Sequence, residues 1–235
     1  MKSIKLSIVA ALLATTSLVS NVSAEELEVS ANVALTSNYV WRGMTQTMNS
    51  PAVQGGVDLA YKGAYAGVWG SSVDFGGIAS SEFDIYAGYA GEVDKFSYDA
   101  GLIQYMYPGE TKAANFAEAY LTLGYDFDVV AVSGMYALGI QTDDLDPGDA
   151  IKFGVSIPLP MDISLDGTYG MYDNKDTTNK GSTKVTKNEF GDYYLVSLSK
   201  SFGKFDWTLA YTGMDYKNAA TTDQNNLVLT VGTSF

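Results

Sequence analysis

The chain has 235 residues, of which 27 are acidic and 14 are basic, and its formal net charge at pH 7 is −13. Such an excess of negative charge argues against nucleic acid as a partner. The sequence contains neither cysteine nor histidine, which excludes disulfides, thiolate–metal sites and a histidine general base. We therefore expect no enzymatic activity and no cofactor.

The first 24 residues have the three parts of a secretory signal peptide. Lys2 and Lys5 supply a positive start, an apolar run follows, and Val22-Ser23-Ala24 forms a small-residue cleavage site. The apolar run is shorter than the about 18 residues that mark a transmembrane helix. We predict that residues 1–24 are removed and that residues 25–235 form one domain.

The chain beyond the signal alternates apolar and polar residues in about twelve segments of about ten residues each, the period of β-strands. The first segment sets Leu27, Val29, Ala31, Val33 and Leu35 against Glu28, Ser30, Asn32, Ala34 and Thr36. The pattern is equally clear over 82–89, 163–169 and 205–212, and less regular over 96–107, 129–139 and 193–202.

The connections between these segments fall into two length classes that do not overlap. We expect about 14, 8, 8, 10, 21 and 11 residues after odd-numbered segments, and about 2, 4, 3, 5 and 2 after even-numbered ones. Bacterial outer-membrane barrels have short periplasmic turns and long external loops. The sequence therefore predicts an all-β fold, a transmembrane antiparallel up-and-down β-barrel with both termini in the periplasm.

Aromatic residues flank the short connections, with Tyr61 and Tyr65 around one turn and Phe202 and Phe205 around another. We interpret them as a girdle at the headgroup level of a membrane, ordinary core aromatics being the alternative. The last segment alternates and ends on Phe235. This end resembles the final strand of bacterial outer-membrane proteins, so we predict that Phe235 is part of the signal read by the barrel-assembly machinery.

Two polar stretches are expected in external loops. The acidic segment 143–149 matches an EF-hand calcium loop only at Asp144 and Asp146 and fails at later ligand positions, so we predict no metal site there. Loose contacts to divalent cations or lipopolysaccharide are the alternative. The stretch 173–187 is predicted to be an exposed loop tip.

Charged residues on the polar face should line the interior of the barrel, its lumen. The candidate pore-lining residues are Asp58, Glu82, Asp84, Glu118, Asp166 and Asp206, with Lys152 as the one clear basic partner. An acidic lumen favours cations over anions. A barrel that conducts nothing would also turn its carboxylates inward, so cation preference is a hypothesis.

Arg42, the last candidate pore-lining residue, is the only arginine and follows Trp41 at the outer end of the first segment. An inward guanidinium opposite Glu82 or Asp84 would constrict the lumen, as charged rings do in porins. A contact with lipid headgroups at the rim, beside Trp41, is the equally weighted alternative.

Seven stretches carry a likeness to a known family. They are SNYVWRG (37–43), PAVQGGVD (51–58), YAGVW (65–69), VDF (73–75), EFDIYAGYAG (82–91), YMYPG (105–109) and NFAEAY (115–120). Together they resemble the TorF family, a proteobacterial group described as porins by analogy and formerly as conserved hypothetical proteins. The resemblance covers essentially all of residues 25–235 and implies an outer-membrane pore with no catalytic residues.

We therefore expect a porin-like channel of a Gram-negative bacterium, through which small hydrophilic solutes or ions diffuse passively. Its other expected partners are outer-membrane lipid and lipopolysaccharide. Two alternatives stay open: a non-conducting outer-membrane barrel that acts in adhesion or envelope structure through its external loops, and a soluble secreted β-protein. The sequence does not indicate the oligomeric state.

Overall fold

The computed structural model describes residues 26–77, 79–109, 115–140, 147–175, 187–217 and 221–235. The predicted signal peptide lies outside the described residues, as do Asp144 and Asp146 of the acidic segment. Among the residues that the structure describes, no helix is long and apolar enough to span a membrane.

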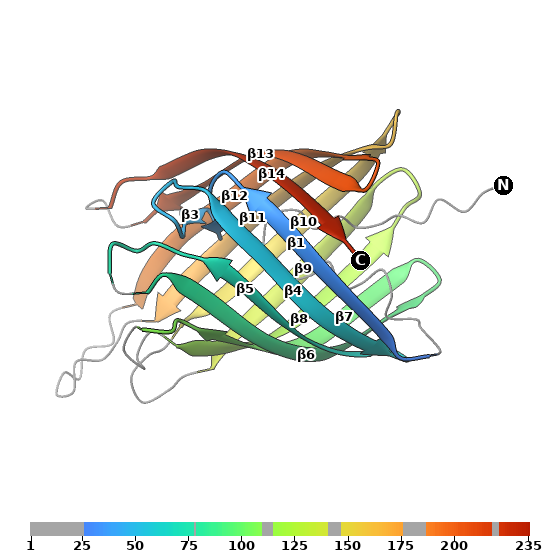
Figure 1. The fold of residues 1–235 in the computed structure, drawn as a ribbon, viewed down its shortest axis with the longest axis horizontal. Helices are drawn as coiled ribbons and strands as arrows, with labels where there is room; N and C mark the ends of the chain where they lie inside the picture. Colours follow the sequence, from blue (N-terminus) through green and yellow to red (C-terminus); the bar gives the residue numbers. More distant parts are fainter. Residues whose placement is uncertain (1–25, 78, 110–114, 141–146, 176–186, 218–220) are drawn as a thin grey trace.

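Twelve antiparallel strands close into a barrel in the order in which they follow along the chain (Figure 1). They are β1 (Glu28–Thr36), β4 (Ala52–Tyr61), β5 (Ala64–Ser72), β6 (Ser81–Val93), β7 (Phe96–Met106), β8 (Phe116–Asp126), β9 (Ala131–Ile140), β10 (Asp149–Leu159), β11 (Ile163–Lys175), β12 (Lys187–Phe202), β13 (Phe205–Tyr216) and β14 (Gln224–Ser234). The short strands β2 (Val40–Trp41) and β3 (Met44–Thr45) pair only with each other. The predicted all-β barrel of about twelve strands is confirmed.

The barrel closes where β1 pairs with β14, with Thr36 opposite Thr230 and Asn32 opposite Ser234. The pairing continues past the end of β14, because the backbone N–H of Phe235 donates to the carbonyl of Ala31 at 2.8 Å. Every barrel strand therefore has a partner on both edges. Closure of this kind removes the unpaired backbone groups that a sheet edge would otherwise present.

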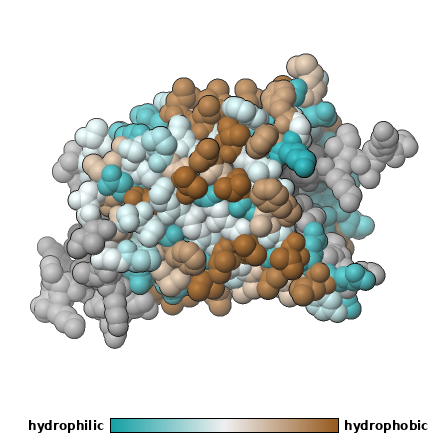
Figure 2. All heavy atoms as spheres, in the orientation of Figure 1, coloured by the Kyte–Doolittle hydropathy of each residue, from teal (hydrophilic) through white to brown (hydrophobic). Residues whose placement is uncertain are grey.

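The wall of the barrel is apolar on its outside. In β14, the outward side chains of Leu227 and Leu229 are 69% and 44% exposed, whereas the inward Val228 is fully buried. Figure 2 shows such hydrophobic side chains gathered on the outer wall of the visible face. Each of the twelve barrel strands carries at least one large apolar side chain that is exposed on the outer face. An apolar outer band of this kind is the surface that a bilayer requires.

The two classes of connection lie at opposite ends of the barrel. Connections of 2 to 4 residues form the short-turn end, and connections of 7 to 15 residues form the long-loop end. The end of β14 lies at the short-turn end (Figure 1). The largest departure from the predicted lengths is between β11 and β12, which are separated by 11 residues rather than by the roughly 21 that alternation predicted. The reason is that backbone pairing runs on to Lys175 and Lys187, beyond the apolar stretch.

The predicted aromatic girdle is only partly correct. Tyr61, Phe202 and Phe205 are exposed on the outside, as expected for a girdle. Tyr65, by contrast, is buried inside the barrel. The two-residue turn sets Tyr61 opposite Ala64, so the next residue, Tyr65, opposes Ala60 and points to the other face.

The interior is packed closely enough for a glycine to be required at Gly67 on β5. A Cβ atom there would lie 2.5 Å from the Asp58 carboxylate and 2.6 Å from the ring of Tyr86. We predict that Gly67→Val lowers the stability of the barrel by about 1–3 kcal/mol, the usual cost of overpacking. Heat-modifiable migration on a gel measures the loss as a lower transition temperature.

Ala66→Val is the matched control, because Ala66 is the neighbouring residue on the exposed outer face of the same strand. It should leave the transition temperature unchanged. Equal transition temperatures for the two variants would contradict the packing described around Gly67.

Candidate functional site

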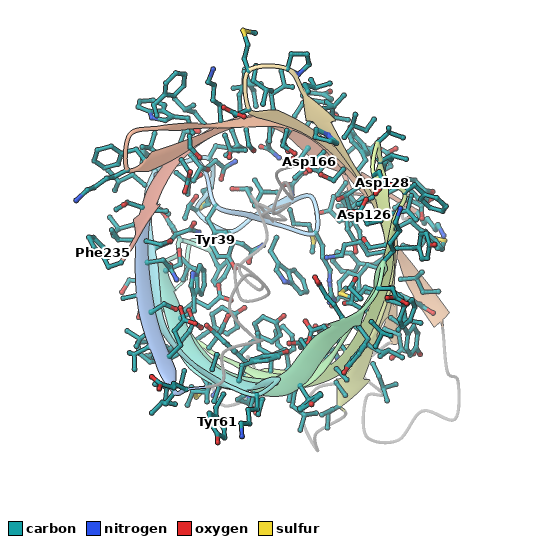
Figure 3. All side chains as sticks on the ribbon, turned by 90° about the vertical axis from the view of Figure 1, so that its right-hand side faces the viewer. Tyr39, Tyr61, Asp126, Asp128, Asp166 and Phe235 are labelled. Atoms are coloured by element: carbon teal, nitrogen blue, oxygen red, sulfur yellow. The ribbon has the colours of Figure 1, made fainter. Side chains whose placement is uncertain are left out.

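The long connection between β1 and β4 folds into the lumen, where β2 and β3 form a hairpin. Figure 3 looks into the barrel from the short-turn end and shows Tyr39, which precedes the hairpin, inside the wall, and Tyr61 and Phe235 outside it. The hairpin is tied to β14, since the Asn38 amide donates to Asn226 at 3.1 Å and the Thr45 N–H to Gln224 at 2.9 Å.

The tip of the hairpin is a turn at Arg42 and Gly43, both with positive φ, of 47° and 79°. Gly43 rests against the backbone of β13, and a Cβ atom on it would lie 2.0 Å from the carbonyl oxygen of Gly213. Glycine is therefore needed at the tip both for its φ and for the close approach. The hairpin packs against β13 and is hydrogen-bonded to β14, and in this position Arg42 points into the lumen.

Arg42 crosses the lumen to the opposite wall. Its Nη2 donates to Oε2 of Glu118 on β8 at 2.8 Å, and both side chains are almost fully buried. In the strand order of the barrel, β8 stands six places from β14, which is halfway round. The guanidinium also lies 4.2 Å from the ring centre of Trp41 and 4.7 Å from that of Tyr172. This ion pair connects the hairpin, which is bound to β14, with β8 on the other side of the interior.

The inward position of Arg42 matches one of the two alternatives left open by the sequence, but its expected partners were wrong. The guanidinium pairs with Glu118 rather than with Glu82 or Asp84. The reason is the docking of the hairpin on β13 and β14, which directs the arginine toward β8 and which no pattern within residues 37–51 indicates.

Three carboxylates lie close to the hairpin in the interior: Glu82 and Asp84 on β6 and Glu118 on β8, which are 1%, 0% and 2% exposed. Glu82 Oε1 accepts from the hydroxyls of Tyr39 at 3.4 Å and Tyr107 at 3.3 Å. Glu118 Oε2 accepts a further bond, from Tyr105 at 3.3 Å. Among the described residues, the other oxygens of Glu82 and Glu118 and both oxygens of Asp84 have no hydrogen-bond partner.

The tyrosines around Glu82 are held in their neutral form. Burial raises the pKa of Tyr39 well above its ordinary value, and the nearby carboxylates of Glu82 and Asp84 raise it further. Burial also raises the pKa of Tyr107, again with Glu82 adding to the effect. Both hydroxyls therefore remain donors to the carboxylate at any physiological pH.

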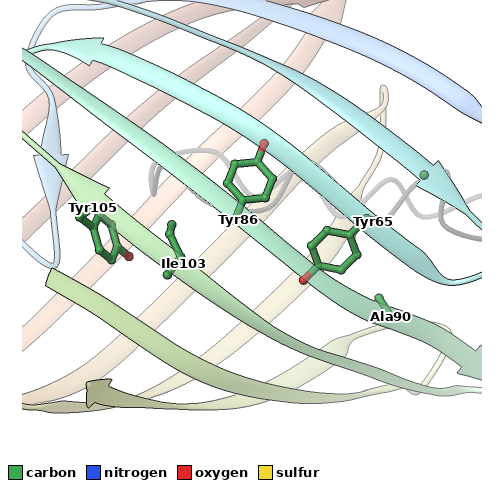
Figure 4. Close-up of a cluster of buried hydrophobic side chains, with 6 residues drawn as sticks. Tyr65, Tyr86, Ala90, Ile103 and Tyr105 are labelled. Atoms are coloured by element: carbon green, nitrogen blue, oxygen red, sulfur yellow. The ribbon is translucent and has the colours of Figure 1, made fainter. Parts of the chain in front are cut away.

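A second polar layer lies nearer the short-turn end. Tyr86 donates to Asp58, and Tyr65 donates to Asp99 at 2.6 Å while its hydroxyl also meets that of Tyr120. Figure 4 shows the Tyr65 and Tyr86 rings among the buried side chains of this region. The sequence pattern does not single out Asp99 as an interior residue, because apolar and polar residues alternate irregularly over 96–107.

Of the remaining candidates, Asp166 and Asp206 make no contact with the hairpin among the described residues, whereas Lys152 interacts electrostatically with Arg42 at the hairpin tip and with Asp99. Lys152 on β10 and Asp166 on β11 are half-buried, and Asp166 accepts from Ser164 at 3.0 Å. Asp206 is exposed at the short-turn end, at the start of β13, and Phe235 is 78% exposed. No group of three acidic side chains in the described part of the chain is arranged to hold a metal ion.

Comparisons with known proteins agree with this architecture. The sequence profile of a family described as "Bacterial protein of unknown function (Gcw_chp)" matches residues 21–235. No curated protein matches the chain.

Two solved structures are similar in fold. One is described as "KdgM porin", with 11% identity, a TM-score of 0.56, and coverage of 88% of this chain and 98% of that one. The other is "KdgM porin in complex with disordered oligogalacturonate", with 12% identity, a TM-score of 0.53 and the same coverage. At this level of identity the likeness concerns the fold.

The buried ion pair generates a test of how the hairpin is held. Arg42→Ala leaves Glu118 buried without its counter-charge, which costs about 3–5 kcal/mol for pairs of this kind. We predict that this variant releases the hairpin while the barrel persists, and that hydrogen exchange of the amides of residues 39–46 accelerates accordingly.

Two further variants control this experiment. Arg42→Met combined with Glu118→Leu removes both charges and should restore much of the protection. Lys95→Ala removes a partner from the exposed Lys95–Asp128 pair, whose side chains are 45% and 73% exposed, and should change nothing. Unchanged exchange in Arg42→Ala would show that the pair does not hold the hairpin.

Proposed function

We propose that this chain, which belongs to the Gcw_chp family of bacterial proteins of unknown function, is a porin-like channel for the passive diffusion of small hydrophilic solutes or ions. The observation that carries the proposal is the Arg42–Glu118 pair, which joins a hairpin held on β13 and β14 to β8 on the other side of a closed barrel. Charged side chains that narrow a lumen are what porin constrictions are built from. The resemblance to the TorF family and the fold shared with KdgM support it as well.

The outer membrane of a Gram-negative bacterium is the proposed location. The apolar outer wall fits a bilayer, and lipid and lipopolysaccharide would cover it. Short turns are periplasmic in such barrels, so the short-turn end and both termini would face the periplasm. Phe235, exposed at that end, would be accessible to the barrel-assembly machinery.

Preference for cations is the finer part of the proposal. Five buried interior side chains are acidic, namely Asp58, Glu82, Asp84, Asp99 and Glu118, and one buried side chain, Arg42, is basic. These numbers refer to the described residues, in which half-buried Lys152 adds a second basic group. An interior field of this sign attracts cations and repels anions.

A non-conducting barrel is the second candidate function, and one observation favours it. Three clusters of buried side chains occupy the interior beside the hairpin, and they include Trp41, Tyr65, Tyr105, Tyr172 and Met214. A lumen filled in this way would serve a protein that acts through its external loops. Conductance separates the two functions.

We predict that the purified full-length protein gives small single-channel steps in planar bilayers. Arg42→Ala should enlarge the steps, because it removes the side chain that crosses the lumen, whereas Lys95→Ala should leave them unchanged. Absence of conductance in both the wild type and Arg42→Ala would favour the non-conducting barrel.

Ion selectivity provides a separate prediction. In a potassium chloride gradient the reversal potential should have the sign of a cation-selective pore, and Asp84→Asn or Glu82→Gln should reduce it. Asp94→Asn, a substitution in an exposed turn at the short-turn end, should not change it. An anion-selective reversal potential in the wild type would contradict the proposed preference.

A further inference from the structure

We propose that Glu82, Asp84 and Glu118 form a binding site for a small organic cation that carries a guanidinium or primary ammonium group. This inference deepens the proposed function by naming a class of solute, and it rests on that function only for the route by which the solute arrives. The hairpin covers the site, and Arg42 occupies part of it.

The first argument is charge balance. Three carboxylates lie in the interior with at most 2% exposure, and Arg42 is the only cation in contact with any of them among the described residues. Four carboxylate oxygens have no hydrogen-bond partner there, including both of Asp84. Buried carboxylates without donors or counter-charge are costly. A second cation would satisfy oxygens that the protein leaves unpartnered.

The second argument concerns the kind of cation. The acidic side chains are not arranged as metal ligands in the described residues, and aromatic rings surround them instead. Asp84 stands opposite Trp69 on β5 and Tyr105 on β7. Trp69 packs edge-on against Tyr39 with ring centres 5.6 Å apart. Carboxylates beside aromatic rings bind ammonium and guanidinium groups through charged hydrogen bonds and cation–π contacts.

The third argument is that Arg42 already shows this mode of binding. Its guanidinium is held by one carboxylate oxygen of Glu118 and by the rings of Trp41 and Tyr172, while its Nη1 has no partner among the described residues. The arginine therefore uses only part of the site. A solute that binds Glu118 would compete with Arg42 for this carboxylate, so the removal of the Arg42 side chain should strengthen solute binding.

Tryptophan fluorescence of the full-length protein in detergent tests the site directly. Trp41 and Trp69 lie at the site, whereas Trp207 is exposed on the outer wall, so Trp207→Phe gives a suitable background. The probe is methylguanidinium at millimolar concentration, and methylurea is its neutral isostere. We expect a saturable change with methylguanidinium and none with methylurea.

Three variants refine the expectation. Asp84→Asn should weaken methylguanidinium binding about tenfold or more, as for loss of a charged hydrogen-bond partner. Arg42→Ala should strengthen it. Asp94→Asn, in the exposed turn, should leave it unchanged. Heat-modifiable migration checks folding, and Glu82→Gln replaces Asp84→Asn if the latter does not fold.

The outcomes separate this inference from the proposed function. No saturable change, equal responses to methylguanidinium and methylurea, or equal affinity in wild type and the Asp84 and Glu82 variants would each overturn the site. Conductance in bilayers would then still support the channel. Saturable, charge-dependent binding without conductance would instead support the site and count against the channel.

Discussion

The structure depends on one constraint, which is that every strand of a sheet in hydrocarbon needs a backbone partner on both edges. The twelve strands meet it by closing β1 on β14, and the pairing extends to Phe235 and Ala31. Closure also divides the side chains into two environments, because successive residues of a strand point to opposite faces. The outer wall can then be apolar while charged groups such as Glu82 and Asp84 are enclosed.

Enclosure changes what the interior charges can do. A carboxylate on the surface is hydrated. Asp84 and Glu118 are instead buried among aromatic rings and the hairpin, so only neighbouring side chains can donate hydrogen bonds to them. Arg42 supplies one partner and tyrosine hydroxyls supply others. The interior thus holds the Arg42–Glu118 ion pair beside carboxylate oxygens that have no hydrogen-bond partner among the described residues. The proposed constriction of the channel and the proposed cation site therefore share the same residues.

The period-two pattern predicted the twelve strands and their alternating connections because facing within a strand is a local property of the sequence. It predicted less where a feature depends on distant parts of the chain. The partner of Arg42 is set by the docking of the hairpin on β13 and β14, where Thr45 binds a residue 179 positions later in the sequence. Tyr65 points inward because of the register of a tight turn. Asp99 is not indicated as an interior residue by the sequence, because β7 has aromatic and small residues on both of its faces. The predicted loop 173–187 is too long at its ends, because the backbones of the polar residues 173–175 and 187 still pair in β11 and β12, which a pattern of apolar alternation does not indicate. Residues 176–186 of that stretch lie outside the described residues.

The hairpin follows the first strand of the barrel, yet it rests on the last two. Gly43 meets Gly213 of β13, and Asn38 and Thr45 bind Asn226 and Gln224 of β14. The surface that supports the hairpin therefore exists only once β13 and β14 have joined the wall. The placement of the hairpin that narrows the lumen therefore depends on β14, the same strand that closes the barrel against β1.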